Sequence, residues 1–206
     1  IREQLIRNHP DVQLYGFFLA KIYNNLGIAL VATGQPDQAI ESHNKAILIK
    51  KKLANGYPSV PKYAVSLARS YSSLGVTLRD IGQTDEAIEL FNKSIVIRKQ
   101  LAENQPGIAK FQMGLADSHA SLAMLFRDIG QTDEAIESHI QVILIAKQLV
   151  TNQPDVMDHT RRLASAYYNV GNRFSALGMT GDAISSYSKA IVLQKQLTKQ
   201  HPDVSS

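Results

Sequence analysis

The histidines are the first residues of this chain whose chemistry could support catalysis or metal binding, since imidazole titrates near neutral pH and ligates metals. His43 and His139 each lie 48 positions before an aromatic residue, and His119 stands where the corresponding position elsewhere holds tyrosine. We therefore interpret these three as packed rings, with a ligand or catalytic role as the alternative. His9 and His201 precede prolines at matching points, which predicts a turn or helix-end role.

Carboxylates are the second candidate group, because the string TDEAIE occurs at 84–89 and again at 132–137. Such a cluster could act as an acid/base pair or a metal site. It recurs, however, where a helix is expected to begin, and negative side chains there cap the helix and oppose its dipole. The chain also lacks cysteine, a His-x-x-x-His pair and a glycine-rich phosphate loop. The sequence thus predicts no catalytic residue, no metal and no cofactor, and hence no enzyme.

Composition limits the remaining classes. The chain has 206 residues, of which 44% are hydrophobic, and a net charge of +4. That length suits one or two domains with a real core, and the mild charge does not indicate nucleic-acid binding. The absence of cysteine fits a reducing compartment, so we expect a cytoplasmic protein. No apolar run is expected to reach the roughly 20 residues of a membrane span, so no membrane contact is expected. Because the chain begins with isoleucine, we expect it to be a piece of a longer one.

An internal repeat organises the whole chain. The string RDIGQTDEAIE runs from 79 to 89 and again, unchanged, from 127 to 137. Several further positions recur with this stride of 48. Two such series are Gly34, Gly82, Gly130 and Gly178, and Ala39, Ala87, Ala135 and Ala183; prolines recur as Pro10, Pro58, Pro106, Pro154 and Pro202.

Within a repeat the apolar residues step by three or four, which predicts two helices per unit. Gly82 can adopt the left-handed conformation that ends the first helix, and Thr84 or Asp85 can cap the second. Pro58 and its equivalents close the second helix. We predict a single array over 1–206, with the end of a preceding helix at 1–10 and repeats at 13–58, 61–106, 109–154 and 156–202.

Small residues are expected where the two helices of a pair approach closely. Phe91 and Tyr187 would fill the wider part of each interface. The predicted close contacts are Gly27 with Ala39, Gly75 with Ala87, Ala123 with Ala135, and Gly171 with Ala183.

These residues carry a family resemblance. The relevant positions of the second unit are Tyr71, Leu74, Gly75, Leu78, Ala87, Phe91 and Ser94. Their spacing resembles the tetratricopeptide repeat signature, although the repeating unit is longer than the usual one. The longer unit is similar to the long-helix repeats of kinesin light chains and of the repeat tails of bacterial signalling proteins. The resemblance implies an all-α, right-handed α-solenoid of four stacked antiparallel helix pairs, with helices of about 20 residues. It also implies that first helices line the inner face and hold protein partners.

By the same resemblance, ligand contacts fall on one stripe of the first helices. The expected partner-binding residues are Leu14, Phe17, Lys21, Asn24, Ile28, Lys62, Val65, Arg69, Ser72, Val76, Arg79, Lys110, Met113, Met124, Arg127, Arg161 and Tyr168. We call these the first-helix stripe. Basic residues far outnumber acidic ones on this face, where Asp117 and Asp158 are the acidic members. Apolar side chains ringed by Lys and Arg predict a concave groove for an acidic and apolar peptide or helix. The alternative is a solvated face whose apolar residues pack against neighbouring helices.

Three functions follow from this reading. The first is a non-enzymatic module that binds a protein segment in the groove. The second is a scaffold that associates with itself through the ends of the array. The two ends of the chain fall at the same point of the repeat, and neither shows an obvious polar capping helix. The third is the regulatory tail of a larger signalling enzyme such as a serine/threonine kinase.

Overall fold

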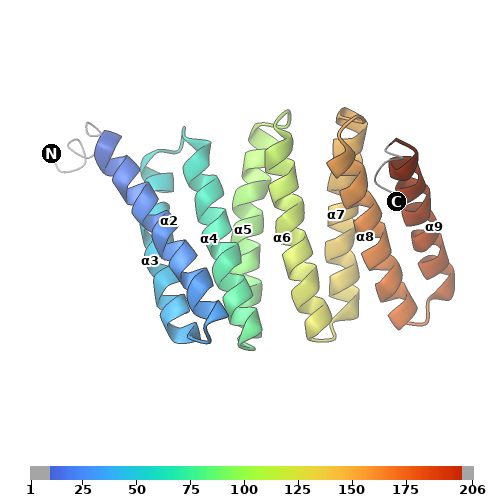
Figure 1. Cartoon of the computed structure of the whole chain (residues 1–206), viewed down its shortest axis with the longest axis horizontal. Coiled ribbons are helices and arrows are strands. Elements are labelled where there is room, and N and C mark those ends of the chain that lie inside the picture. Colours follow the sequence, from blue (N-terminus) through green and yellow to red (C-terminus); the bar gives the residue numbers. More distant parts are fainter. Residues whose placement is uncertain (1–9, 201–206) are drawn as a thin grey trace. The chain divides into compact units, whose positions relative to one another are not determined.

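A computed structural model describes residues 10–200, and within this range the chain forms eight α-helices and no strand (Figure 1). The helices are α2 (Pro10–Ala32), α3 (Pro36–Gly56), α4 (Pro61–Asp80), α5 (Thr84–Asn104), α6 (Ala109–Asp128), α7 (Thr132–Asn152), α8 (Met157–Ala176) and α9 (Thr180–Gln200). Each has between 20 and 23 residues, which confirms the predicted helix length. The predictions for 1–9, His201 and Pro202 lie outside the described residues.

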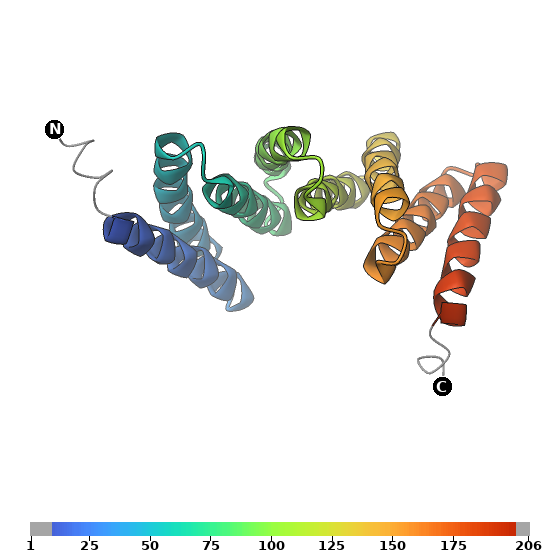
Figure 2. The same cartoon turned by 90° about the horizontal axis from the view of Figure 1, so that it is seen from above.

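The chain divides into two compact units, Ile1–Glu103 and Asn104–Ser206. In the first unit α2 packs on α3, α3 packs on α4, and α2 also touches α4 (Figure 2). In the second unit α6 packs on α7, α7 on α8, and α8 on α9. In these pairs, and in α4 and α5 where Phe91 lies against Gly75, helices that follow one another in sequence are neighbours in space, as stacked helix pairs require. The predicted repeat boundaries stay predictions.

The turn inside each pair is built as the sequence predicts. Gly82 has a φ of 79°, and the glycines at the three equivalent positions have φ between 72° and 77°. The N–H of Gln83 donates to the carbonyl of Leu78 at 2.8 Å, and the N–H of Gly82 donates to that of Arg79 at 3.0 Å. These bonds satisfy carbonyls at the end of α4 that would otherwise lack partners, so the glycine ends the helix.

The predicted side-chain caps are not seen at the two starts where they can be checked. The residue preceding α7 is Gln131, and its side chain makes no capping hydrogen bond. Thr84 lies inside α5, and its hydroxyl donates back to the carbonyl of Gly82 at 3.5 Å. The helix begins at the threonine, so the threonine cannot also be the flanking cap. Asp85 and Glu86 do lie in the first turn of α5, where the helix dipole favours them.

The prolines fall into two groups. Pro58, Pro106 and Pro154 lie in the turns that follow α3, α5 and α7, as predicted. Pro10 was expected to close a helix in the same way, but it lies within α2. The fixed φ of proline suits the first turn of a helix, where its missing N–H has no intrahelical partner to lose.

The close approach inside the helix pairs is between a glycine and a ring, whereas the rings of Phe91 and Tyr187 were expected to fill the wider part of the interface. A Cβ atom added at Gly27 or Gly171 would lie 2.7 Å from the ring of His43 or Tyr187, respectively. The same atom at Gly75 would lie 3.1 Å from the ring of the facing phenylalanine. The facing alanines of the second helices are buried, so these contacts are closed to solvent. At these three positions the absence of a side chain leaves room for a full ring at this distance.

α2 differs from the other helices because it is apolar around most of its circumference. Contrary to the expectation of no long apolar segment, Gln13–Ala32 is long and apolar enough to cross a membrane by length and composition. Interspersed Lys and Asn made the segment look short in the sequence. A core helix of a soluble protein passes the same test, and this helix packs on α3 and α4. One such helix does not establish a membrane span.

Candidate functional site

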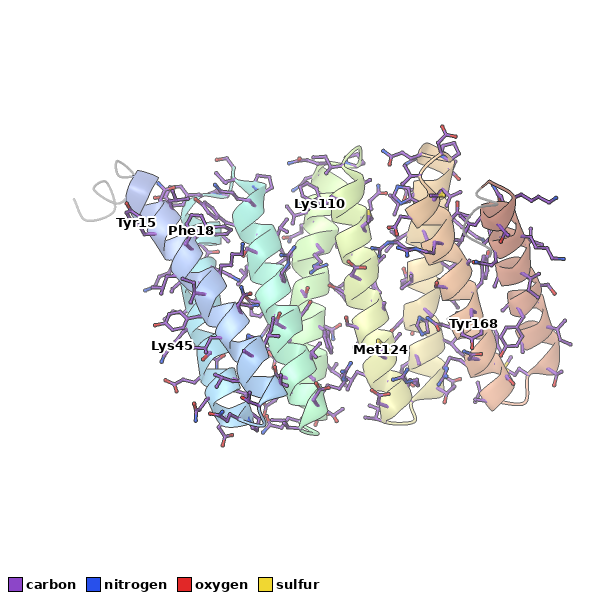
Figure 3. All side chains as sticks on the ribbon, in the orientation of Figure 1. Tyr15, Phe18, Lys45, Lys110, Met124 and Tyr168 are labelled. Carbon is purple, nitrogen blue, oxygen red and sulfur yellow. The ribbon has the colours of Figure 1, made fainter. Side chains whose placement is uncertain are left out.

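The first-helix stripe is largely accessible in the described structure. Its exposed members are Leu14, Lys21, Ile28, Lys62, Arg69, Lys110, Met124, Arg127, Arg161 and Tyr168, and its half-buried members are Phe17, Val65, Ser72, Val76, Arg79 and Met113. Lys110 and Met124 extend from α6 and Tyr168 extends from α8 (Figure 3). Each unit thus presents apolar and basic side chains on its first helices.

Asn24 is the exception, because it is buried in the first unit and is not on the accessible stripe. Its Oδ1 accepts a hydrogen bond from the hydroxyl of Ser70 at 2.8 Å, and its Nδ2 donates to that of Ser73 at 3.5 Å. Asn24 therefore links α2 to α4. The prediction that it contacts a ligand is wrong for this arrangement of the helices, because its polar atoms are already used.

The positive potential of the stripe is weaker than the excess of basic over acidic residues in the sequence predicted. Three of its basic residues form ion pairs with aspartates: Arg79 with Asp80 at 2.7 Å, Arg127 with Asp128 at 2.5 Å, and Arg161 with Asp158. Among the described residues, Lys21, Arg69 and Lys110 have no carboxylate within ion-pair distance, and Lys62 lies 5.1 Å from the ring centre of Tyr63. Positive potential is expected mainly around these four residues.

His43 and His139 behave as packed rings, as interpreted from sequence. His43 is 0% exposed and neither ring nitrogen has a hydrogen-bond partner among the described residues. Burial, followed by the charge of Lys50, lowers the pKa of His43 to about 4. Burial also lowers the pKa of His139 to about 4, with smaller contributions from Arg173 and Arg127. Both rings are neutral at pH 7. The described part of the chain contains no group of three His, Asp or Glu side chains placed to hold a metal.

A buried lysine lies beside His43 in the first unit, and the sequence reading missed it. Lys50 is 3% exposed, and its Nζ donates to the hydroxyl of Ser70 at 2.6 Å. Ser70 in turn donates to Asn24, so a chain of hydrogen bonds joins α3, α4 and α2. Burial, followed by the charge of Arg69, lowers the pKa of Lys50 to about 8. No carboxylate of the described residues pairs with it.

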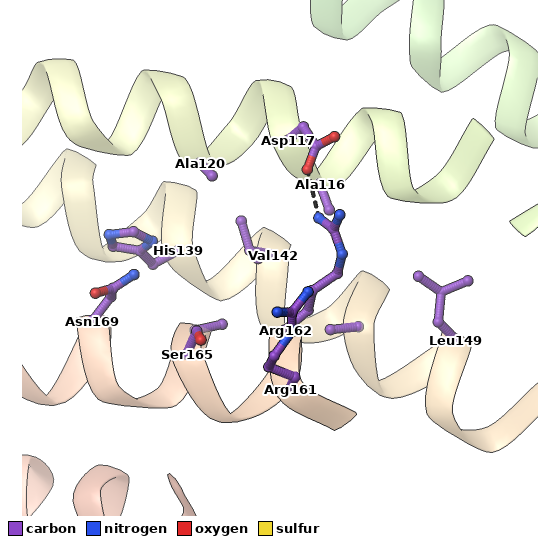
Figure 4. Close-up of a pocket in the computed structure, with 12 residues that line it drawn as sticks. Ala116, Asp117, Ala120, His139, Val142, Leu149, Arg161, Arg162, Ser165 and Asn169 are labelled. Carbon is purple, nitrogen blue, oxygen red and sulfur yellow. Dashed lines mark hydrogen bonds and ion pairs between the residues drawn. The ribbon is translucent and has the colours of Figure 1, made fainter. Parts of the chain in front are cut away.

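The second unit holds a pocket of about 320 Å³ between α6, α7 and α8 (Figure 4). It is lined by Ala116, Asp117, Ala120, His139, Val142, Ala146, Leu149, Arg161, Arg162, Ser165, Ala166 and Asn169. Four alanines and Val142 form its apolar wall, and the polar residues come mostly from the first helices α6 and α8. Asp117, Ala120 and Ser165 belong to the same face of the first helices as the stripe. The pocket therefore joins a buried wall to the predicted binding surface.

Comparison of the two units explains why this volume is empty. Two strides of the repeat carry Asn24, Lys50 and Ser70 onto Ala120, Ala146 and Ala166. The three side chains that form the hydrogen-bonded chain of the first unit are thus all alanine in the second. His43 and Leu53 are kept, as His139 and Leu149. The pocket lies where Lys50, its acceptor Ser70 and the next acceptor Asn24 stand in the first unit.

Arg162 crosses the mouth of the pocket. Its Nη1 donates to Asp117 Oδ1 at 2.7 Å, which ties α8 to α6 (Figure 4). Its Nε donates to Asp158 Oδ2 at 2.7 Å. Asp158 also accepts from Arg161, and the hydrogen bonds from Arg162 and Arg161 lower the pKa of Asp158. Among the described residues, Arg161 pairs only with Asp158, which also pairs with Arg162. The side chain of Arg161 is 71% exposed. It retains donors for a second carboxylate.

Comparison with known protein families agrees with the repeat reading. Models of the tetratricopeptide repeat family match residues 20–53, 67–106 and 118–149, which together make up about half of the chain. The chain belongs to the tetratricopeptide repeat family. Repeats of this family generally serve as protein-interaction modules and not as enzymes. A search of curated proteins found no match to this tetratricopeptide chain.

Solved structures show the fold of this tetratricopeptide chain. BtubC (BKLC) from P. vanneervenii shares 19% identity over 90% of this chain and 66% of its own, with a TM-score of 0.69. Aspartyl phosphate phosphatase F from Bacillus subtilis shares 16% identity over 91% of this chain and 42% of its own, with a TM-score of 0.66. The DHF58 filament shares 18% identity over 92% and 97%, with a TM-score of 0.59. The chain thus spans about two thirds or less of the first two proteins. At these identities the likeness shows the all-α solenoid fold alone.

The pocket and the buried lysine could have been found by reading the repeat for its exceptions. The repeat is recognised from positions that keep one residue type at every stride. Lys50 and Ala146 occupy one position and differ in both size and charge, which is the signal that their surroundings differ. Arg162 carried no such signal, because its partner Asp117 lies on another helix.

Proposed function

We propose that this chain is a non-enzymatic module that binds a segment of a partner protein along the first-helix stripe. The observation that supports it is the exposure of apolar side chains, such as Leu14, Met124 and Tyr168. The same stripe carries Lys21, Arg69 and Lys110, which pair with no carboxylate of the described residues. A surface of this kind favours an extended or helical segment that carries acidic and apolar residues. Tetratricopeptide repeats generally bind proteins, which supports the same role.

The test begins with crosslinking in native lysate, followed by identification and purification of the captured protein. Binding of that protein is then measured by calorimetry against a charge-reversal variant, Lys21→Glu with Arg69→Glu and Lys110→Glu. We expect binding to weaken at least tenfold in this variant, and wild-type binding to weaken as salt increases.

The matched control reverses three lysines of the second helices, Lys51→Glu, Lys52→Glu and Lys195→Glu. All three are exposed, so the control changes the net charge equally without touching the stripe. Equal affinity of both variants for the partner would contradict the proposal.

Self-association is a second candidate, favoured by one face of α2. Tyr15 is 70% exposed, whereas Tyr63, which follows it by one stride in α4, is 4% exposed. Leu26 is likewise exposed, whereas Leu74 is buried. Tyr15 and Phe18 project outward from α2 (Figure 3). In α4 the equivalent face lies against α3, so α2 presents a surface that suits another helix of the same type.

Likeness to the DHF58 filament supports this second candidate at the level of fold. Light scattering over a hundredfold concentration range tests it. We expect a mass that rises with concentration in the wild type and stays monomeric after Tyr15→Glu. A wild-type mass that stays monomeric at all concentrations would rule it out. The regulatory-tail role and the cytoplasmic location stay predictions.

A further inference from the structure

The first unit shows which kind of side chain fits between three such helices. Lys50 reaches from α3 toward α2 and α4, and its four-carbon stem is buried together with its ammonium. Ala146 occupies the same position of the repeat in the second unit, and the pocket opens there. A side chain with an aliphatic body of similar length can therefore enter this space from a partner.

The charge at the end of that side chain must differ, however. The Ser70 hydroxyl that accepts from the Lys50 ammonium, and the Asn24 amide that accepts from Ser70, are replaced by the methyl groups of Ala166 and Ala120. An ammonium against this inner wall would lack the acceptor that Lys50 has in the first unit. The inner wall thus favours a fully apolar side chain.

Groups around the mouth favour a neighbouring negative charge. Arg161 and Arg162 stand at the mouth, and they share Asp158. Arg162 makes a further bond to Asp117, so Arg161, which makes one hydrogen bond fewer to the described residues and has a more exposed side chain, has more donors left for a ligand. His139, which also lines the pocket, is neutral and adds no charge of either sign.

We propose that this pocket anchors one aliphatic side chain of the partner segment, of leucine, isoleucine or methionine size, next to an acidic residue that Arg161 binds. The inference rests on the proposed function, since it names the residues that the partner would present to the second unit. It adds a site of defined chemistry within the stripe. About 320 Å³ accommodates such a side chain without displacing the apolar wall.

Three capped dipeptides test the site without knowledge of the partner. The whole chain is labelled with ¹³C at alanine methyl groups and titrated with acetyl-Leu-Asp-amide, acetyl-Leu-Lys-amide or acetyl-Ser-Asp-amide. We expect the first to shift the Ala120 and Ala146 methyl signals saturably in the millimolar range. The second should bind at least fivefold more weakly, and the third should produce no saturable shift. Equal effects of the three probes, or no saturable shift by the first, would overturn the proposal.

Variants localise the effect. Ala146→Leu fills the pocket and should abolish the saturable shifts at Ala120. Gln148→Leu adds the same side chain at an exposed position of α7 and should leave them unchanged. Arg161→Gln should remove the preference for Leu-Asp over Leu-Lys and keep the methyl shifts. If Ala146→Leu fails to fold, the result for Arg161→Gln alone decides whether the proposed site exists. Retained binding in a folded Ala146→Leu protein, or a retained preference in Arg161→Gln, would reject the site.

The two proposals fail in different ways. If the stripe charge-reversal variant keeps full partner affinity while acetyl-Leu-Asp-amide still binds, the proposed function is wrong and the pocket stands. If charge reversal abolishes partner binding but folded Ala146→Leu binds the partner as the wild type does, the pocket is not the anchor.

Discussion

Replacing Lys50 by methionine is the most informative perturbation of the fold. Methionine keeps an unbranched side chain of similar length and removes the ammonium. Lys50 is buried, and its one hydrogen bond to a described residue goes to Ser70, which keeps its bond to Asn24 in the variant. The change therefore removes a buried charge with little loss of packing.

The magnitude follows from the pKa of Lys50, which burial and Arg69 lower from 10.5 to about 8. This difference corresponds to at most about 3 kcal/mol, at 1.36 kcal/mol per pKa unit. Between pH 8 and 10.5 the unfolded chain binds more protons at this lysine than the folded chain does. The free energy of unfolding of the wild type therefore rises with pH in this window. Below about pH 8 the full destabilisation is present.

We expect Lys50→Met to be more stable than the wild type at pH 7 by about 2 kcal/mol, because loss of one hydrogen bond offsets about 1 kcal/mol of the gain. The advantage should shrink by about 3 kcal/mol as pH rises to 10.5. Urea unfolding followed by circular dichroism at pH 7, 8, 9 and 10 measures it. Lys51→Met, at an exposed neighbouring position, serves as control and should show no such trend. A stability difference between Lys50→Met and wild type that is the same at every pH would refute the reasoning.

Three further predictions concern the helix pairs, and thermal or urea unfolding checks each. Gly171→Ala should destabilise by about 1–2 kcal/mol, because the added methyl would lie 2.7 Å from the Tyr187 ring and overpacking outweighs the better helix propensity; unchanged stability would contradict it. His43→Phe should stabilise by about 1 kcal/mol at pH 7, because two unpaired ring nitrogens are replaced by the ring type that Phe91 provides at the equivalent position. Since the pKa of His43 is lowered to about 4, wild-type stability should fall as pH drops from 6.5 to 4, and the variant's advantage should widen over that range; a constant advantage would argue against a neutral buried ring. Gly82→Ala should lose about 1 kcal/mol, because its φ of 79° is unfavourable for alanine; no loss would show that the turn can be rebuilt.

The helices and their turns could be predicted because they depend on neighbouring residues. A glycine that must be left-handed and apolar residues at helical spacing are local signals, and each occurs four times in this chain. The predicted caps at Thr84 and Asp85 were wrong because helix starts shift easily by one residue when several polar residues adjoin. A close approach at Gly75 was also predicted, but the group that lies against it is the Phe91 ring and not the expected Ala87.

The candidate site was only partly predictable. The exposed stripe follows from helical periodicity, but the pairing of Arg161 and Arg162 with Asp158 depends on which rotamers meet. Asn24 has the same helical phase as exposed residues, yet it is buried because Ser70 and Ser73 of α4 lie against it. A residue on the border between a stripe and an interface can belong to either, and the neighbouring helix decides.

By itself, the sequence determined the number of helix pairs, the position of each turn and the small residues that let the paired helices approach, because a fixed stride repeats the same local constraints. The tertiary structure decided where charge remains unpaired and where space is left open. Those properties depend on side chains from three helices that meet around Lys50 in one unit and Ala146 in the other. A pattern of identical positions describes what the repeats share, whereas a pocket arises from the few positions at which they differ.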